Sequence, residues 1–114
     1  MKYLKYAKEL PWQPHPAGFP GVQMKFLRSQ NDGDYQESIA IVKVSVGSVV
    51  PPHVHENEDD NFYILSGRAF MRVGKERFPI GPEAQITVPS GEEHEIYDVS
   101  EELQIYDVFA PKIF

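Results

Sequence analysis

The sequence predicts an all-β domain built as a sandwich or barrel, and three observations support this fold class. Eight glycines and ten prolines interrupt its 114 residues at short intervals and mark many turns. The runs between these turns are rich in Val, Ile, Phe and Tyr, which favour β-strands. No stretch shows a convincing helical pattern of ten residues. The length suits one domain with a single modest core.

The expected elements follow in chain order. Residues 11–21, PWQPHPAGFPG, hold too much Pro and Gly for regular structure and are expected to form an extended arm. A strand VQMKFL, an NDGD turn and the strand ESIAIVKVSV follow, and in the last of these Ala40 and every second residue to Val46 share one face. Later strands are expected around turns at Ser66-Gly67 and Gly74-Lys75: NFYIL, AFMRV, ERFPI, AQITV, HEIYDV and LQIYDVFA.

We expect these elements to form one domain, with residues 1–35 as an N-terminal arm and lead-in strand and residues 36–114 as the barrel. Seventeen acidic against eleven basic residues give a net charge of −6, which argues against a nucleic-acid partner because phosphate neutralisation requires clustered Lys and Arg. The absence of cysteine excludes disulfides and thiolate ligands, so a metal would need nitrogen and oxygen ligands. No apolar run suits a signal peptide or a membrane span, and we expect a cytoplasmic protein without a membrane partner.

The stretch PPHVHENEDDN contains the first candidate ligands. On a strand, the imidazoles of His53 and His55 would project to the same face and reach a common ion. Asp60 follows a short acidic loop and shares its strand face with Phe62, so its carboxylate is a plausible further ligand. His94 opens a strand after the turn PSGEE and supplies a third imidazole. Each histidine alone is more often structural, but their joint spacing predicts a divalent metal site.

The spacing resembles two sequence motifs of the cupins. The first motif, G-x5-H-x-H-x3,4-E-x6-G, is matched from Gly47 to Gly67, with Asp60 at the position of the acid. The second, P-x-G-x2-H, is matched by residues 89–94, and Asp98 replaces its closing Asn. The resemblance implies a double-stranded β-helix, or jelly-roll, barrel that holds one divalent metal. The ligands it implies are three histidines and one acid: His53, His55, Asp60 and His94.

The chain departs from these motifs in two ways. Asp60 stands where the family has Glu, and its shorter side chain requires the ion to lie closer to that strand or to be reached through water. Asp59 and Glu58 are rival ligands, although only Asp60 keeps the six-residue spacing to Gly67. In the second motif, seven residues rather than five separate Gly81 from Pro89.

The implied function is that of a metal-dependent enzyme acting on a small oxygenated molecule, a carboxylic acid or sugar derivative. Decarboxylases, isomerases and dioxygenases all occur among cupins. The alternative is a non-catalytic small-molecule binding or sensor barrel. A set of imidazole and carboxylate ligands suits Mn, Fe, Ni, Co or Zn, and the ion should be lost as the pH falls through the histidine range. A general acid or base is not identified; five polar strand residues are candidates: Asp98, Asp107, Tyr106, Gln104 and Lys43.

Two further expectations concern the ends of the chain. His15, which lies among prolines in the arm, is interpreted as structural. The apolar arm and the C-terminal VFAPKIF need cover, which a homodimer or the chain's own barrel would provide. The residues expected to supply that contact are Trp12, Phe19, Ile113 and Phe114.

Overall fold

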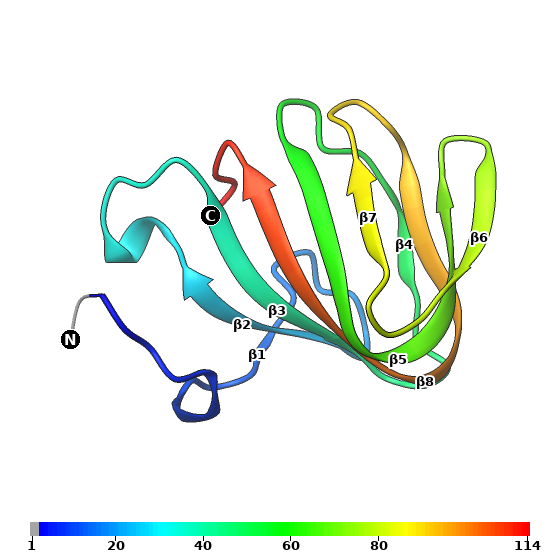
Figure 1. Ribbon diagram of the computed structural model, residues 1–114, viewed down its shortest axis with the longest axis horizontal. Helices are drawn as coiled ribbons and strands as arrows, with labels where there is room; N and C mark the ends of the chain where they lie inside the picture. Colours follow the sequence, from blue (N-terminus) through cyan, green and yellow to red (C-terminus); the bar gives the residue numbers. More distant parts are fainter. Residues whose placement is uncertain (1–2) are drawn as a thin grey trace.

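The computed structural model describes residues 3–114 as an antiparallel β-barrel of two layers that share two long strands, β5 (Asp59–Val73) and β8 (His94–Ala110) (Figure 1). In the first layer the order is β1 (Gln13–Pro14), β2 (Val22–Arg28), β3 (Ser38–Val44), the second half of β8, the first half of β5 and β7 (Gln85–Val88). In the second layer the order is β4 (Val50–His53), the first half of β8, the second half of β5 and β6 (Glu76–Ile80). Two short 3-10 helices span Ala7–Glu9 and Gln30–Asp32. The predicted all-β jelly-roll fold is confirmed.

The two long strands differ from the sequence prediction, which placed a turn at Ser66-Gly67. The structure instead continues β5 through this point, and its register with β8 shifts on either side of Ser66. Gly67 has a φ of 95°, and a Cβ there would overlap the carbonyl oxygen of Glu102. Glycine is therefore needed for close approach and a positive φ inside a strand rather than for a turn. The predicted HEIYDV and LQIYDVFA are likewise halves of one strand, β8.

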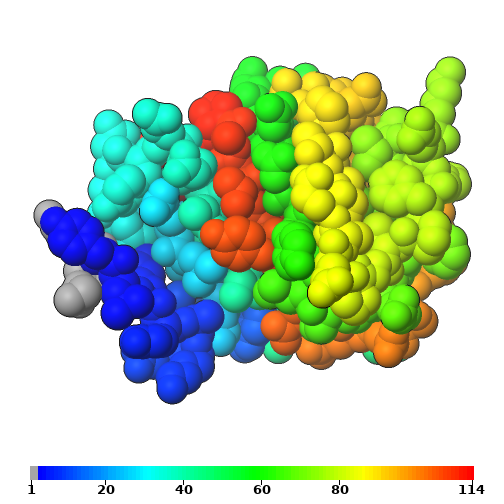
Figure 2. Space-filling model, viewed as in Figure 1, coloured from blue at the N-terminus to red at the C-terminus, as the bar shows by residue number. Residues whose placement is uncertain are grey.

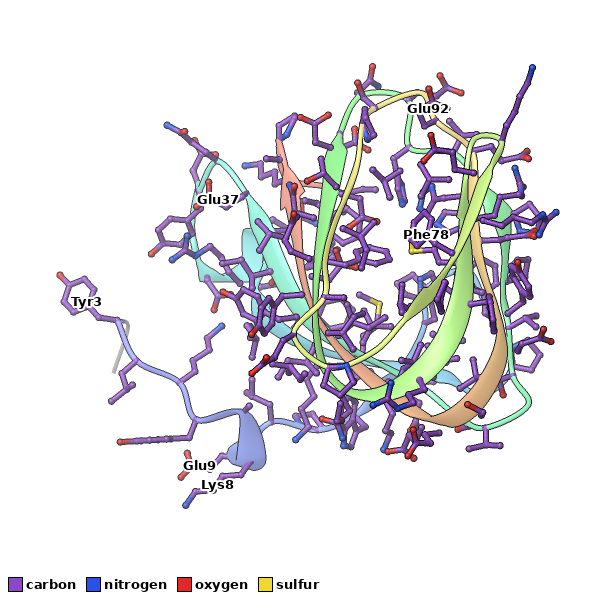
Figure 3. The ribbon with its side chains drawn as sticks, turned by 45° about the vertical axis from the view of Figure 1, so that its right-hand side comes forward. Tyr3, Lys8, Glu9, Glu37, Phe78 and Glu92 are labelled. Carbon is purple, nitrogen blue, oxygen red and sulfur yellow. The ribbon has the colours of Figure 1, made fainter. Side chains whose placement is uncertain are left out.

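Alternating burial along the strands builds the core between the two layers. In β3 every second residue from Ser38 to Val44 is buried, as period-two geometry requires. Val46 was expected on the same face, but β3 ends at Val44 and the Val46 side chain is 62% exposed. From β6, Phe78 packs against the core and lies toward the inside of the curved sheet (Figure 3). The interior is thereby filled from both layers.

The end of the barrel where β5 and β8 bend, which we call the base, lies opposite the loops that carry the histidines (Figure 1). Its interior is aliphatic and fully or almost fully buried. The residues there are Val44, Ala69, Ile80, Val99 and Leu103.

The N-terminal arm includes one short strand, β1, which pairs with β2, so the expectation of no regular structure in residues 11–21 is wrong at Gln13–Pro14. Before β1 the chain lies on the outside of the barrel (Figure 2), and Tyr3, Lys8 and Glu9 point away from the core (Figure 3). No helix within residues 3–114 is long and apolar enough to cross a membrane.

The apolar residues at the two ends find part of their cover on the chain itself. Lys25 and Lys43 lie over the ring of Trp12, with Nζ 4.8 and 4.2 Å from its centroid. The ring of Phe114 packs edge-on against Phe26, with centroids 4.9 Å apart. Ile113 is 42% exposed. The homodimer stays a prediction, which light scattering at micromolar concentration will test.

Candidate metal centre

The three predicted histidines come from the loop end of the second layer. His53 is the last residue of β4 and pairs with His94, the first residue of β8. His55 lies beyond β4 in the connecting loop, so strand alternation does not place it beside His53, contrary to the sequence argument. The loop is held by a hydrogen bond from Gly91 N–H to the carbonyl oxygen of His55, at 2.8 Å. Two loops from distant parts of the sequence thus position the imidazoles together.

The histidine rings form a compact group. One ring nitrogen from each of His53, His55 and His94 lies within 4.8 Å of the other two, so the group can hold a metal ion. The centroid of the His53 ring is 4.1 Å from that of His94 and 4.9 Å from that of His55. His94 is fully buried, whereas His53 and His55 are half-buried. The group therefore faces the barrel interior and remains partly open on one side.

Backbone carbonyls fix the tautomers of two of these rings. His53 Nδ1 lies 2.8 Å from the carbonyl oxygen of Pro51, and His94 Nδ1 lies 3.1 Å from that of Glu92. Because a carbonyl can only accept, each Nδ1 must carry the proton, which leaves each Nε2 with a free lone pair. This is the arrangement that supports metal-binding histidines in proteins. His94 Nε2 is buried without a hydrogen-bond partner within residues 3–114.

Asp60 lies beside the histidines, on the inner face of β5. Its Oδ2 is 3.5 Å from His55 Nε2 and 3.7 Å from His94 Nε2, and the residue is 1% exposed. Its Oδ1 is buried without a hydrogen-bond partner among the residues described. The rival Asp59 faces outward, where its Oδ1 accepts a 3.0 Å hydrogen bond from Ser90 N–H, and Glu58 is half-buried in the loop. Of the three acids, Asp60 is the one that the structure places against the imidazoles.

Electrostatics favour the protonation states that a metal would require. Burial, together with the neighbouring His94 and His55, lowers the pKa of His53 to about 4, although the hydrogen bond to Pro51 opposes this shift. Burial alone would raise the pKa of Asp60, but interactions with Asp107, His55 and His94 outweigh it and hold that pKa below its ordinary value. At neutral pH His53 is therefore neutral and Asp60 is ionised.

Asp107 is the second carboxyl group of this region. Burial, reinforced by the charge of Asp60, raises the pKa of Asp107 well above its ordinary value. The residue is 4% exposed, and its Oδ1 has no hydrogen-bond partner within residues 3–114. Burial and the neighbouring Asp60 therefore favour the protonated form of Asp107.

Of the five polar residues that the sequence offered as an acid or base, Asp107 alone lines the cavity beside the histidines. Asp98 and Tyr106 are exposed, Gln104 lies on the outer side of β8, and Lys43 covers Trp12. Strand periodicity could have singled out Asp107. It takes an inward position between Ile105 and Phe109, where an apolar residue would be expected.

The cavity beside the histidines has a volume of about 40 Å³. Apolar side chains from both layers form most of its wall, and five ionisable side chains reach it. These are His15, His53, His55, Asp60 and Asp107. His15, which the sequence led us to interpret as structural, also lines this cavity. Its position in a proline-rich arm has no motif spacing to the other histidines, so the sequence did not predict this placement.

Comparison with known proteins agrees with this architecture. A family model described as Cupin domain matches residues 40–109. An uncharacterised protein of Streptomyces coelicolor is 29% identical over 91 residues, which cover 80% of this chain and 81% of that protein.

Solved structures share the fold. KdgF from Halomonas sp. superposes with a TM-score of 0.82 at 23% identity, covering 95% of this chain and 94% of that one. A predicted oxalate decarboxylase from Thermotoga maritima gives 0.82 at 26% identity, covering 95% and 98%. Ectoine synthase from P. lautus gives 0.83 at 18% identity, covering 96% and 78%. With a matching family model over more than half its length and this fold, the chain belongs to the cupin family.

Proposed function

We propose that this protein binds one divalent metal ion through His53, His55, His94 and Asp60. The observation that carries the proposal is the convergence of three imidazoles, two of them with Nε2 left free by hydrogen bonds at Nδ1. The fit is supported by His94 Nε2, which is buried without a hydrogen-bond partner among residues 3–114. Such an atom costs stability unless it binds something, and a cation would satisfy it, with Asp60 Oδ2 close by, 3.7 Å from the same nitrogen.

The bound ion would serve a metal-dependent enzyme that acts on a small oxygenated acid or sugar derivative. An ion in this position would supply a Lewis acid toward a carboxylate or carbonyl oxygen. The chain's own residues exclude water from the inner side of the site, since Val42, Ile96 and Ile105 line the cavity there. Support comes from solved cupins with the same fold, which include an ectoine synthase and a predicted oxalate decarboxylase.

Elemental analysis of the purified protein tests the metal site. We expect near-stoichiometric metal in the wild type and in the control Gln104→Ala, which alters the outer side of β8. His53→Ala and His94→Ala should each lose more than about a hundredfold in metal affinity, because removal of a ligand exceeds the effect of removing its supporting groups. Equal, negligible metal in the wild type and all three variants would refute the site.

The alternative is a barrel that binds a small molecule without turning it over. The size of the cavity favours it, because about 40 Å³ leaves little room for both a substrate and an attacking group. A panel of small oxygenated acids and sugars, incubated with and without a chelator, separates the two functions. Turnover that disappears with the chelator supports the enzyme; saturable binding with unchanged ligand supports the binding barrel.

A further inference from the structure

The N-terminal arm, far from the histidine motifs in sequence, brings His15 to the cavity beside the candidate metal centre. Its backbone is fixed on both sides: His15 N–H donates to the carbonyl oxygen of Val22 at 3.1 Å, and Gly18 N–H donates to that of His15 at 2.8 Å. The imidazole is half-buried and lines the same cavity as His53, His55 and Asp60. The arm thereby contributes one side chain to the cavity wall.

The hydrogen bonding of His15 differs from that of the other histidines. Ala17 N–H donates to His15 Nδ1 at 3.0 Å, so Nδ1 is an acceptor and the proton of the neutral ring lies on Nε2. Within residues 3–114, Nε2 has no hydrogen-bond partner. Burial, with a smaller contribution from His55, holds the pKa of His15 below its ordinary value, which keeps the ring neutral at pH 7. His15 thus offers one fixed N–H donor, whereas His53 and His94 offer lone pairs.

Phe19 links this donor to the candidate metal ligands. The Phe19 ring stacks on that of His15, with centroids 4.6 Å apart and an interplanar angle of 19°. The same ring lies 5.9 Å from the centroid of His53. Phe19 therefore contacts both imidazoles, and its packing contributes to the position of His15 relative to the site.

The charge and size of the site define the ligand that such a donor would recognise. A divalent ion with three neutral imidazoles and one carboxylate keeps a net charge of about +1, which favours an anion. A water molecule needs roughly 10–15 Å³ of such space, so the cavity of about 40 Å³ admits roughly three atoms of that size. Its remaining lining is largely aliphatic or aromatic and includes Val22, Met24 and Val50. A carboxylate head group meets these limits, with the rest of the molecule extending past the arm.

We propose that His15 is a ligand-binding residue whose Nε2–H donates a hydrogen bond to an oxygen of a small carboxylate held at the metal centre. The inference deepens the proposed function and rests on it. It gives the N-terminal arm, which lies outside the two histidine motifs, a role in ligand selection.

The test uses Co²⁺-loaded protein with oxalate and acetate as probes. Co²⁺ affinity and the dissociation constant of each anion are measured by visible absorption for the wild type, His15→Ala and His15→Gln. We expect His15→Ala to leave Co²⁺ affinity within about twofold and to weaken oxalate binding roughly tenfold, the range for a hydrogen bond to a charged group. His15→Gln, which keeps a side-chain N–H, should restore most of the lost affinity.

Imidazole ¹⁵N NMR of the metal-free protein adds a readout that does not depend on activity. His15 should show the Nε2–H tautomer, opposite to the Nδ1–H tautomers of His53 and His94.

Any one of three results would overturn the inference about His15 but leave the proposed metal site standing. These are oxalate binding in His15→Ala equal to that of the wild type, a loss of Co²⁺ affinity in His15→Ala that parallels its loss of oxalate affinity, or a wild type that takes up Co²⁺ but binds neither anion. A wild type that takes up no Co²⁺ would instead refute the proposed metal function, and with it the inference.

Discussion

The two ends of the barrel interior are built from opposite kinds of side chain. At the base, Val44 and Leu103 are fully buried and aliphatic. At the loop end, His94, Asp60 and Asp107 are almost as deeply buried, and each has a side-chain atom without a hydrogen-bond partner within residues 3–114. Each such atom costs on the order of 1–3 kcal/mol of folding free energy. The loop end is therefore suited to bind and the base to stabilise.

This contrast explains why β5 and β8 run the full length of the molecule. Each strand contributes to both ends: β8 begins at His94, passes through Leu103 at the base and returns to Asp107. Packing at the base therefore fixes the direction in which the polar residues enter the site. The destabilising polar groups are tolerated because the same strands are held by aliphatic packing elsewhere.

The largest stability effect is expected from Leu103→Ala at the base. Loss of a fully buried leucine leaves a cavity and should lower the free energy of unfolding by about 3 kcal/mol, as measured by urea denaturation. The metal affinity of the protein that remains folded should change by less than about threefold. Leu103 supports no ligand, and altering a group that does support a ligand usually changes the affinity by about 10–100-fold. Val46→Ala, at a 62% exposed position, is the control. A metal affinity that falls with stability would show that the two ends are not separable.

Asp107 tests whether the polar end works as a unit. Asp107→Ala removes the group facing Asp60 and should weaken metal binding by about tenfold to a hundredfold, because supporting groups orient the ligand. Asp107→Asn keeps an N–H donor of similar size and should recover most of this loss. Competition with a chromophoric chelator measures both. Equal losses in the two variants would show that an N–H donor at this position does not replace the Asp107 carboxyl, and would contradict a donor role for Asp107 toward Asp60.

The sequence predicted those parts of the site that depend on local spacing. His94 was expected to open a strand, and it is the first residue of β8. Asp60 was expected to share a face with Phe62, and both are buried on β5. The alternation of buried and exposed residues along β3 was also predicted correctly from Ala40 to Val44. In each case a period of two residues suffices.

The sequence failed where distant segments meet. The turn predicted at Ser66-Gly67 was wrong because glycine there allows close approach of Glu102, a contact no local pattern contains. His55 was placed on a strand, whereas it lies in a loop fixed by Gly91. His15 reaches the cavity only because the arm folds back against the barrel. Such placements are set by tertiary packing.

The metal-free polar end should also be sensitive to pH through His53. With a folded pKa of about 4 against 6.5 for a free histidine, the unfolded chain binds a proton that the folded chain does not, so stability falls as the pH falls from 6.5 to 4. Because the side chain is only half-buried, we expect the loss to be on the order of 1–2 kcal/mol. Urea denaturation in the presence of a chelator measures it, and His53→Gln should flatten this part of the profile. Parallel profiles for the two proteins would contradict the shift.

The smallest effect is expected on the outer surface, where Arg68 Nε lies 3.1 Å from Glu101 Oε2 and the two side chains are 65% and 61% exposed. Glu101→Gln keeps the size of the side chain and removes its charge, and it should change the free energy of unfolding by less than about 0.5 kcal/mol. The change should shrink further at high salt, since exposed charges are screened. Glu101 is two residues from Leu103 on β8, so the pair of variants compares charge with burial at one place in the fold. If Glu101→Gln were as damaging as Leu103→Ala, stability at the base would depend on its surface charges, and the division between a binding end and a stabilising end would fail.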